Sequence, residues 1–220
     1  MDIAALVQSL TISALPIIFA ITLHEAAHGY AARHFGDPTA WMLGRISANP
    51  LRHIDPIGTL LVPAVIVFTS YVALDSVFIF GWAKPVPVNF GRLRNPKRDM
   101  LWVAGAGPAA NLAMALAWAL LFKLVTLMPI HAYSLPLAEM ARIGINVNIG
   151  LMVLNLLPLP PLDGGRIAVS LLPYPLAVRF SQLERWGFPI LLVLLFTGLL
   201  GDIMRPFVVA LKRLIVLLIS

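Results

Sequence analysis

The chain alternates between long apolar runs and short polar segments. Runs without a charged residue cover residues 3–23, 56–74, 100–122, 143–162 and 186–201. A helix that crosses a membrane needs about 20 mostly apolar residues, so several of these runs are long enough to cross. The pattern predicts an all-α polytopic membrane protein with five to six transmembrane or re-entrant helical segments.

Helix-breaking residues divide the runs into elements. A first helix is predicted over residues 3–33, because Gly36-Asp37-Pro38 would end it. Residues 39–55 contain several turn signals, so we expect an extended or looping segment there. Residues 57–82 form a second apolar stretch. The prolines of residues 84–89 then favour extended backbone, since proline fixes its own φ and disfavours helix in the residue before it.

The second half of the chain predicts one plain span and one broken helix. A clean span is expected over residues 99–123. The run from 143 to 157 contains Asn146, Asn148 and Asn155 and then meets Pro158, which indicates a discontinuous helix. A short helix should restart at Asp163 and reach about residue 172. Residues 188–200 and 206–219 are expected to form a last kinked or paired hydrophobic element.

Composition narrows the possible functions. Of the 220 residues 60% are hydrophobic and 12% charged, whereas soluble domains carry about 25% charge. Residues 1–220 are therefore expected to form a single integral membrane domain. The net charge of +6 comes from Lys and Arg in short loops, which topology explains, so no nucleic-acid partner is expected. The absence of Cys excludes thiolate catalysis and Cys-ligated metal.

The first helix contains candidate metal-binding and catalytic residues in the segment His24-Glu25-Ala26-Ala27-His28. The i, i+4 spacing places both imidazoles on one helical face, and this is the HExxH pattern. In zinc enzymes with this pattern, two neutral His nitrogens bind Zn²⁺ and the Glu accepts a proton from the metal-bound water. A polar helix end at the membrane interface is the alternative interpretation.

A catalytic zinc site needs a third protein ligand, which in this chain must be His, Asp or Glu. Asp163 is the strongest candidate because a proline-rich break in an intramembrane helix delivers it, and such irregular backbone is tolerated where it lines a cavity. Its alternative role is to cap the short helix that follows. His34, His53 and His131 lie in loops and are left outside the ligand set.

With these residues the sequence resembles the site-2 protease family of intramembrane zinc metalloproteases. Three features carry the resemblance: residues 24–28 (His-Glu-Ala-Ala-His), residues 104–111 (Ala-Gly-Ala-Gly-Pro-Ala-Ala-Asn) and residues 155–164 (Asn-Leu-Leu-Pro-Leu-Pro-Pro-Leu-Asp-Gly). The last matches the family's N-x-x-P-x-x-x-L-D-G pattern. The chain resembles the compact bacterial and archaeal members that lack a PDZ or CBS domain.

The resemblance implies a set of roles. His24, His28 and Asp163 would be the ligands of one Zn²⁺ per chain, and Glu25 the general base. It also places Asn155 near the site, where an amide could bind the oxyanion or the substrate backbone, although helix–helix contact is an equal alternative. Asn111 and Asn148 are expected to be packing and hydrogen-bonding residues.

The resemblance further implies an activity and a substrate class. The reaction would be peptide-bond hydrolysis within or near the transmembrane segments of single-span membrane proteins. Residues 81–89 would be a membrane-associated β-like element, whose unpaired edge could add a substrate strand.

Orientation follows from the position of the candidate ligands. His24 and His28 lie near the C-terminal end of the first helix, and Asp163 follows the C-terminal end of the 143–157 element, so both elements must run in the same direction. We therefore expect residues 57–82 to enter the membrane and return. By the positive-inside rule the site would then lie toward the cytoplasmic side of a prokaryotic cell membrane.

A membrane metal-ion or proton transporter is the main alternative function. Intramembrane His, Glu and Asp on a broken helix also form transport sites. Glu25 distinguishes the two, because a protease keeps it unligated beside water, whereas a transporter would use it as a ligand or proton carrier.

Overall fold

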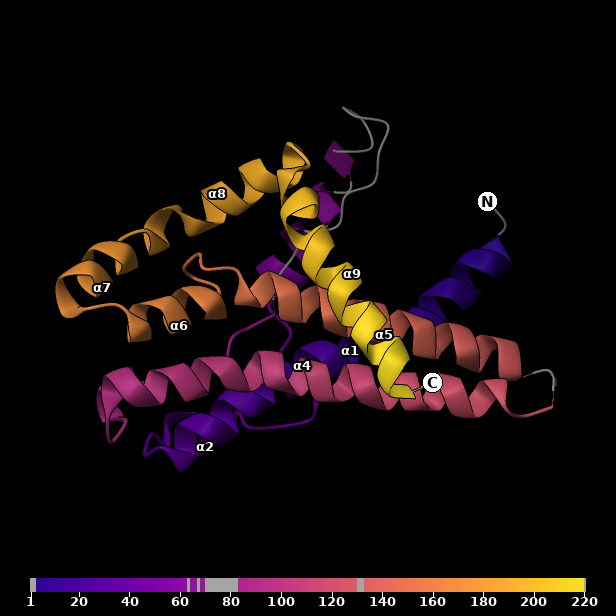
Figure 1. The fold of residues 1–220 in the computed structure, drawn as a ribbon, viewed down its shortest axis with the longest axis horizontal. Coiled ribbons are helices and arrows are strands. Elements are labelled where there is room, and N and C mark those ends of the chain that lie inside the picture. Colours follow the sequence, from indigo (N-terminus) through magenta and orange to yellow (C-terminus); the bar gives the residue numbers. More distant parts are fainter. Residues whose placement is uncertain (1–2, 63, 67, 70–82, 130–132, 220) are drawn as a thin grey trace.

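The computed structural model describes residues 3–62, 64–66, 68–69, 83–129 and 133–219 (Figure 1). These residues form helices and contain no strand, which confirms the all-α prediction. Three helices are long and apolar enough to cross a membrane: α1 (Ile3–His34), α4 (Pro96–Thr126) and α5 (Ser134–Leu156). A bent helix pair at the C-terminus raises the number to four within the described residues, so the predicted five to six segments are not confirmed.

The three long helices pack side by side, with α4 in contact with both α1 and α5. In Figure 1, α1 and α5 run in the same direction and α4 runs opposite to them, as the candidate ligands required. Small side chains bring the helices close: a Cβ added at Gly144 of α5 would lie 2.4 Å from the Trp118 ring of α4. A buried core of Ala115, Ala119 and Ile149 continues this contact.

Helix α1 ends where the sequence predicted. Gly36 has a φ of +110°, a left-handed conformation that glycine adopts without strain and that stops a helix. The following segment was expected to be extended or looping, and this is partly wrong. It contains a helical turn, α2 (Thr39–Met42), and a 3₁₀ turn, η1 (Pro50–Arg52), that starts with proline.

The second apolar stretch begins with a π-helical turn, η2 (Pro56–Leu61), and continues as a short apolar helix to Ile66. The Asp55 side chain caps this turn by accepting the N–H groups of Ile57 and Gly58. Most of the remainder of the 57–82 stretch lies outside the described residues. Its two ends meet, because the Lys84 N–H donates to the His53 carbonyl (2.8 Å).

Helix α5 differs from the discontinuous helix that was predicted over residues 143–157. It begins earlier than predicted and runs without interruption through Asn146 and Asn148. The side-chain amides of Asn148 and Asn155 donate to carbonyls one turn earlier, those of Gly144 (2.8 Å) and Leu151 (3.0 Å), so they do not need to break the helix. The helix ends at Leu156, before the predicted proline break.

The C-terminal part folds into four shorter elements. These are α6 (Asp163–Leu171), α7 (Tyr174–Ser181), α8 (Glu184–Phe196) and α9 (Leu199–Ile219). The short helix at Asp163 and the paired last element were predicted, and α8 and α9 meet at an angle of 84°. Helix α7 was not predicted. Residues 163–171 lie at the end of the bundle where α1 and α5 both finish (Figure 1).

Candidate active site

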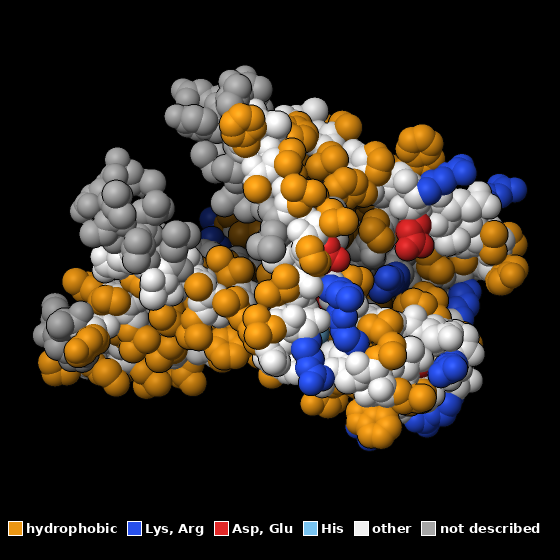
Figure 2. All heavy atoms as spheres, turned by 180° about the vertical axis from the view of Figure 1, so that it is seen from behind, with side chains coloured by type: hydrophobic (Ala, Val, Ile, Leu, Met, Phe, Trp, Pro, Cys, Tyr) orange, Lys and Arg blue, Asp and Glu red, His pale blue; other side chains and the backbone are white. Residues whose placement is uncertain are grey.

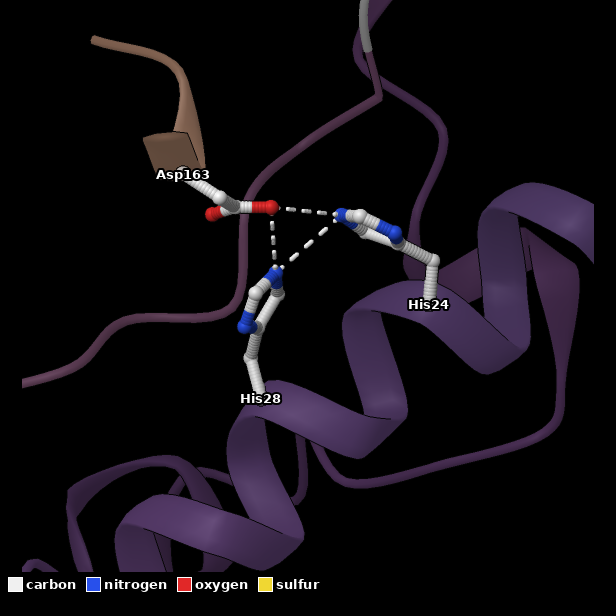
Figure 3. Close-up of side chains that lie close together, drawn as sticks. All are labelled: His24, His28 and Asp163. Atoms are coloured by element: carbon white, nitrogen blue, oxygen red, sulfur yellow. Dashed lines mark hydrogen bonds and ion pairs between the residues drawn. The ribbon is translucent and has the colours of Figure 1, made fainter. Parts of the chain in front are cut away.

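His24 and His28 lie one turn apart on α1, and their rings point toward Asp163 (Figure 3). Each side chain is buried, with 7% of its residue surface exposed. Their Nε2 atoms are 3.1 Å apart. The HExxH spacing therefore brings two imidazoles together inside the protein, as the helical period requires.

Asp163 comes from the opposite side, as the first residue of α6 (Figure 3). Its Oδ2 atom lies 3.2 Å from Nε2 of His24 and 3.2 Å from Nε2 of His28. Glycines make the approach possible: a Cβ added at Gly164 would lie 2.3 Å from the carbonyl oxygens of Leu156 and Leu157. The proline-rich segment and the glycines together place this carboxylate against α1.

The other ring nitrogens fix both imidazoles in one orientation. His24 Nδ1 lies 2.6 Å from Asn111 Oδ1, and His28 Nδ1 lies 2.7 Å from the Val103 carbonyl oxygen. Carbonyl oxygens only accept hydrogen bonds, so each Nδ1 carries the proton. In the neutral form of each ring Nε2 then keeps its lone pair, and the two Nε2 atoms face the same space.

Asn111 has a larger role than the sequence suggested. It is fully buried, and besides meeting His24 it donates through Nδ2 to Asn148 Oδ1 (2.9 Å) and to the Ala20 carbonyl (3.2 Å). The amide is therefore held in one orientation, with its oxygen toward the histidine. Sequence reasoning placed Asn111 among the packing and hydrogen-bonding residues and did not connect it with His24. The glycine-rich segment before it was the available signal, since close helix approach brings Asn111 within reach of α1.

The three converging atoms fit a zinc ion. Tetrahedral coordination at about 2.0–2.1 Å places ligand atoms about 3.3 Å apart, close to the separations seen here. Asp163 Oδ2 is buried without a hydrogen-bond donor, as expected for an atom that binds a cation. Among the described residues these three form the only group of His and carboxylate side chains close enough to hold a metal.

Glu25 lies beside this group but not in it. It lines a cavity of about 120 Å³ together with His24, His28 and Asp163, room for several water molecules. Its Oε2 atom accepts the Val86 N–H (2.8 Å). Within the described part of the chain its Oε1 makes no hydrogen bond. One carboxylate oxygen is thus fixed, and the other has no hydrogen-bond partner among the described residues.

The segment that reaches Glu25, residues 83–89, is not a strand, so the β-like element is not confirmed; residues 81 and 82 lie outside the described part. Side chains and carbonyls hold it instead. The Arg45 guanidinium donates to the Lys84 (3.0 Å) and Pro85 (3.3 Å) carbonyls, and the Asn89 N–H donates to Asp37 (2.6 Å). The expected free edge is therefore partly occupied.

Asp37, which binds the Asn89 end of this segment, is itself held by further hydrogen bonds. Its side chain also accepts the N–H (3.0 Å) and the hydroxyl of Thr39. Burial alone would raise the pKa of Asp37, but these hydrogen bonds, with the charge of Arg92, hold that pKa below its ordinary value. Asp37 therefore stays ionised and fixes the end of the segment that lines the cavity.

Asn155 lines the cavity from the last turn of α5. One of its amide hydrogens is committed to the Leu151 carbonyl. The amide oxygen and the second hydrogen have no partner among the described residues. The structure thus places all five sequence-predicted site residues around one cavity.

Known proteins resemble the chain over most of its length. A Bacillus subtilis protein named "Putative zinc metalloprotease YwhC" is 38% identical over 198 residues, 87% of this chain and 83% of that protein. "Putative zinc metalloprotease Rip2" of Mycolicibacterium smegmatis is 32% identical over 185 residues, 84% of this chain and 66% of that protein. No protein-family model and no solved structure matches. The match to the first relative covers most of both chains, and the chain belongs to the site-2 protease family of zinc metalloproteases.

Proposed function

We propose that this protein is an intramembrane zinc endopeptidase that hydrolyses peptide bonds within or near the spans of single-span membrane proteins. The observation that carries this proposal is the convergence of two imidazoles and a carboxylate beside a free carboxylate oxygen, between helices long enough to cross a membrane. The names of the relatives support zinc-dependent proteolysis.

His24, His28 and Asp163 would hold one zinc ion. Zinc bound there would act as a Lewis acid and lower the pKa of water toward about 7. Asn111 and the Val103 carbonyl would keep the two imidazoles in the tautomer that leaves Nε2 free. Gly107 of α4 gives the rings space, since a Cβ there would lie 2.4 Å from His28 Nε2.

Replacing Asn111 with alanine should lower zinc affinity by about 10- to 100-fold, because the hydrogen bond that orients His24 is lost. Competition with a chromogenic chelator measures this affinity. Asn146→Ala is the matched control, since Asn146 is exposed on α5. Equal zinc affinity in Asn111→Ala and wild type would refute an orienting role for Asn111.

Glu25 would act as the general base. Its side chain lines the cavity, and its second oxygen can accept a proton from the attacking water, while the Val86 N–H holds the other oxygen in place. The same carboxyl group can then give the proton to the leaving amine. Glu25 lies outside the group of converging ligand atoms, which favours the protease over the transporter alternative.

Asn155 would donate its second amide hydrogen to the developing oxyanion or to the substrate backbone. It borders the cavity on the side of α5, and residues 83–89 border it through Pro85, Val86 and Val88. A substrate must unwind to enter, because a helix hides its peptide bonds from attack. Residues 83–89, with the backbone groups that remain open, could then pair with the unwound substrate.

The site would face the cytoplasm of a cell whose membrane the protein crosses several times. Eleven of the 16 Lys and Arg residues belong to the end of the bundle that carries α2, α6 and α7: Arg33, Arg45, Arg52, Lys84, Arg92, Arg94, Lys97, Arg98, Arg166, Arg179 and Arg185. Figure 2 shows basic side chains gathered at this end, with apolar side chains covering the opposite end. The positive-inside rule assigns the basic end to the cytoplasm.

Residues 57–82 would enter the membrane and return. The hydrogen bond between residues 53 and 84 supports this, because the stretch between them leaves and returns at one place. Single cysteines at exposed positions before and after this stretch test re-entry, because the chain has no native cysteine. Ala48→Cys and Asn95→Cys should both react with an impermeant maleimide from the cytoplasmic side. Labelling from opposite sides would contradict re-entry.

The proposed activity is tested with a single-span substrate reconstituted in liposomes with the purified, zinc-loaded protein. Mass spectrometry of the products should place the cut within or next to the substrate span. If soluble peptides are cleaved while the span and its borders stay intact, the enzyme would be a protease of another substrate class. If zinc crosses the liposome membrane and no peptide is cleaved, the transporter alternative would replace it.

A further inference from the structure

Arg166 places a positive charge at the wall of the candidate active site. It lies three residues after Asp163 on α6, and side chains with this spacing on a helix are neighbours, with Cβ atoms about 5–6 Å apart. The side chain is half-buried and lines the same cavity as Glu25 and Asp163. Of the described residues that line this cavity, it is the only Lys or Arg.

Arg166 is positioned by an aromatic ring beside its guanidinium and by the packing of its helix. The central carbon of the guanidinium lies 5.5 Å from the ring centroid of Phe90, which also lines the cavity. Phe90 starts a 3₁₀ turn, η3 (Phe90–Arg92), that Asn89 caps through its side chain. The helix that carries Arg166 is itself fixed, because the glycines that follow Asp163 dock α6 tightly against the end of α5. Arg166 is thus directed into the cavity from a rigid frame.

The charge of Arg166 has no counter-ion in the described structure. Among the described residues, Lys and Arg side chains form one ion pair, that of Arg142 with Glu139, and Asp163 lies against His24 and His28. A guanidinium is always charged in proteins, and burying part of it without an anion beside it is unfavourable. The carboxylates of Glu25 and Asp163 would not neutralise the charge of Arg166, since a bound zinc ion would balance their two negative charges.

An entering substrate can supply the missing anion. A carboxylate fits best, because its two oxygens match the two parallel N–H donors of a guanidinium. We propose that Arg166 binds a carboxylate of the substrate beside the scissile peptide bond, so that the protease selects acidic substrates. This rests on the proposed function. The carboxylate can be an Asp or Glu side chain, or the free C-terminus of a previously trimmed substrate.

Matched substrates test this inference. One pair differs only by Glu or Gln at positions flanking the mapped cut, and a second pair differs only by a free or amidated C-terminus near the cut. Wild type should cleave the acidic member of one pair with a kcat/KM about 10- to 100-fold higher, the strength of a charge-assisted hydrogen bond. The pair that shows the preference identifies the source of the carboxylate.

The variants Arg166→Gln and Arg166→Lys separate recognition from other roles. In Arg166→Gln the preference should fall to about one, and in Arg166→Lys it should be partly retained, because lysine keeps the charge but not the fork of donors. Zinc content should stay at the wild-type level in both. Arg179→Gln is the control, since Arg179 is an exposed cation on the neighbouring α7, and this variant should keep the full preference.

Two results would overturn the inference. One is a wild-type enzyme that cleaves both members of each pair equally well. The other is an Arg166→Gln variant that loses the same factor of activity on the acidic and the neutral substrate, which would place Arg166 in the reaction step or in the fold. Failure of the proposed function looks different, because wild type would then cleave none of the substrates.

Discussion

Replacing Gly107 with alanine is expected to abolish zinc binding and proteolysis together. The added Cβ would lie 2.4 Å from His28 Nε2 and 2.6 Å from His24 Cε1, closer than real side chains approach one another. Helix α4 is packed against both α1 and α5 and cannot retreat, so the two imidazoles must move. A shift of this size should weaken zinc binding by about 100-fold or more. Metal analysis and chelator competition on the purified variant measure the loss.

Gly105→Ala is the matched control for this prediction. It is the same substitution one half-turn earlier on the same helix, where the added Cβ meets nothing within 4 Å. This variant should retain zinc and activity, and its small gain in helix propensity should not harm the fold. If Gly107→Ala bound zinc like wild type, the imidazoles would not lie where the structure places them.

The second large effect is expected from Glu25→Gln. The substitution keeps the size of the side chain and an oxygen for the Val86 N–H, but it removes the group that accepts a proton. Loss of a general base lowers rates by about 10²- to 10⁴-fold, and we expect the upper part of this range because the same carboxyl would serve both proton transfers. Zinc should remain near one per chain, since Glu25 is outside the ligand group. Cleavage kinetics and metal content are measured on the same preparation.

Glu184→Gln, which changes an exposed glutamate on α8, should leave both quantities unchanged. Wild-type cleavage by Glu25→Gln would exclude Glu25 as the base. Loss of zinc from Glu25→Gln would instead favour Glu25 as a ligand, as the transporter alternative requires.

The sequence could predict the parts of the site that depend on short-range order. The helical period alone places His24 and His28 on one face, because four residues make about one turn. The end of α1 at Gly36 and the restart of a helix at Asp163 follow from local glycine and proline chemistry. The meeting of Asp163 with the histidines was inferred from the proline-rich break before it and from the family resemblance, and the parallel course of α1 and α5 was inferred from that meeting.

Contacts between distant segments could not be predicted in the same way. The bond from His24 to Asn111 joins residues 87 positions apart, and the acceptor for His28 is a backbone carbonyl that any residue could supply. The bond from Val86 to Glu25 likewise depends on how Arg45, His53 and Asp37 hold residues 83–89. These interactions orient the site, yet they have no recognisable spacing in the chain.

Two of the errors in local structure have clear physical reasons. Asn146 and Asn148 were expected to interrupt a helix, but Asn148 satisfies its amide inside the bundle and Asn146 is exposed. Helix α7 was missed because Pro175 lies in its first turn, where proline is tolerated, and not in its interior.

The most direct test of the account is the dependence of cleavage on zinc in the purified protein. A single-span substrate is incubated with protein that has been stripped by a chelator and with the same protein after zinc is added back, and metal content is measured at each step. We expect cleavage to stop when zinc is removed and to return as zinc approaches one ion per chain. Cleavage that continues at full rate in zinc-free protein would contradict the account.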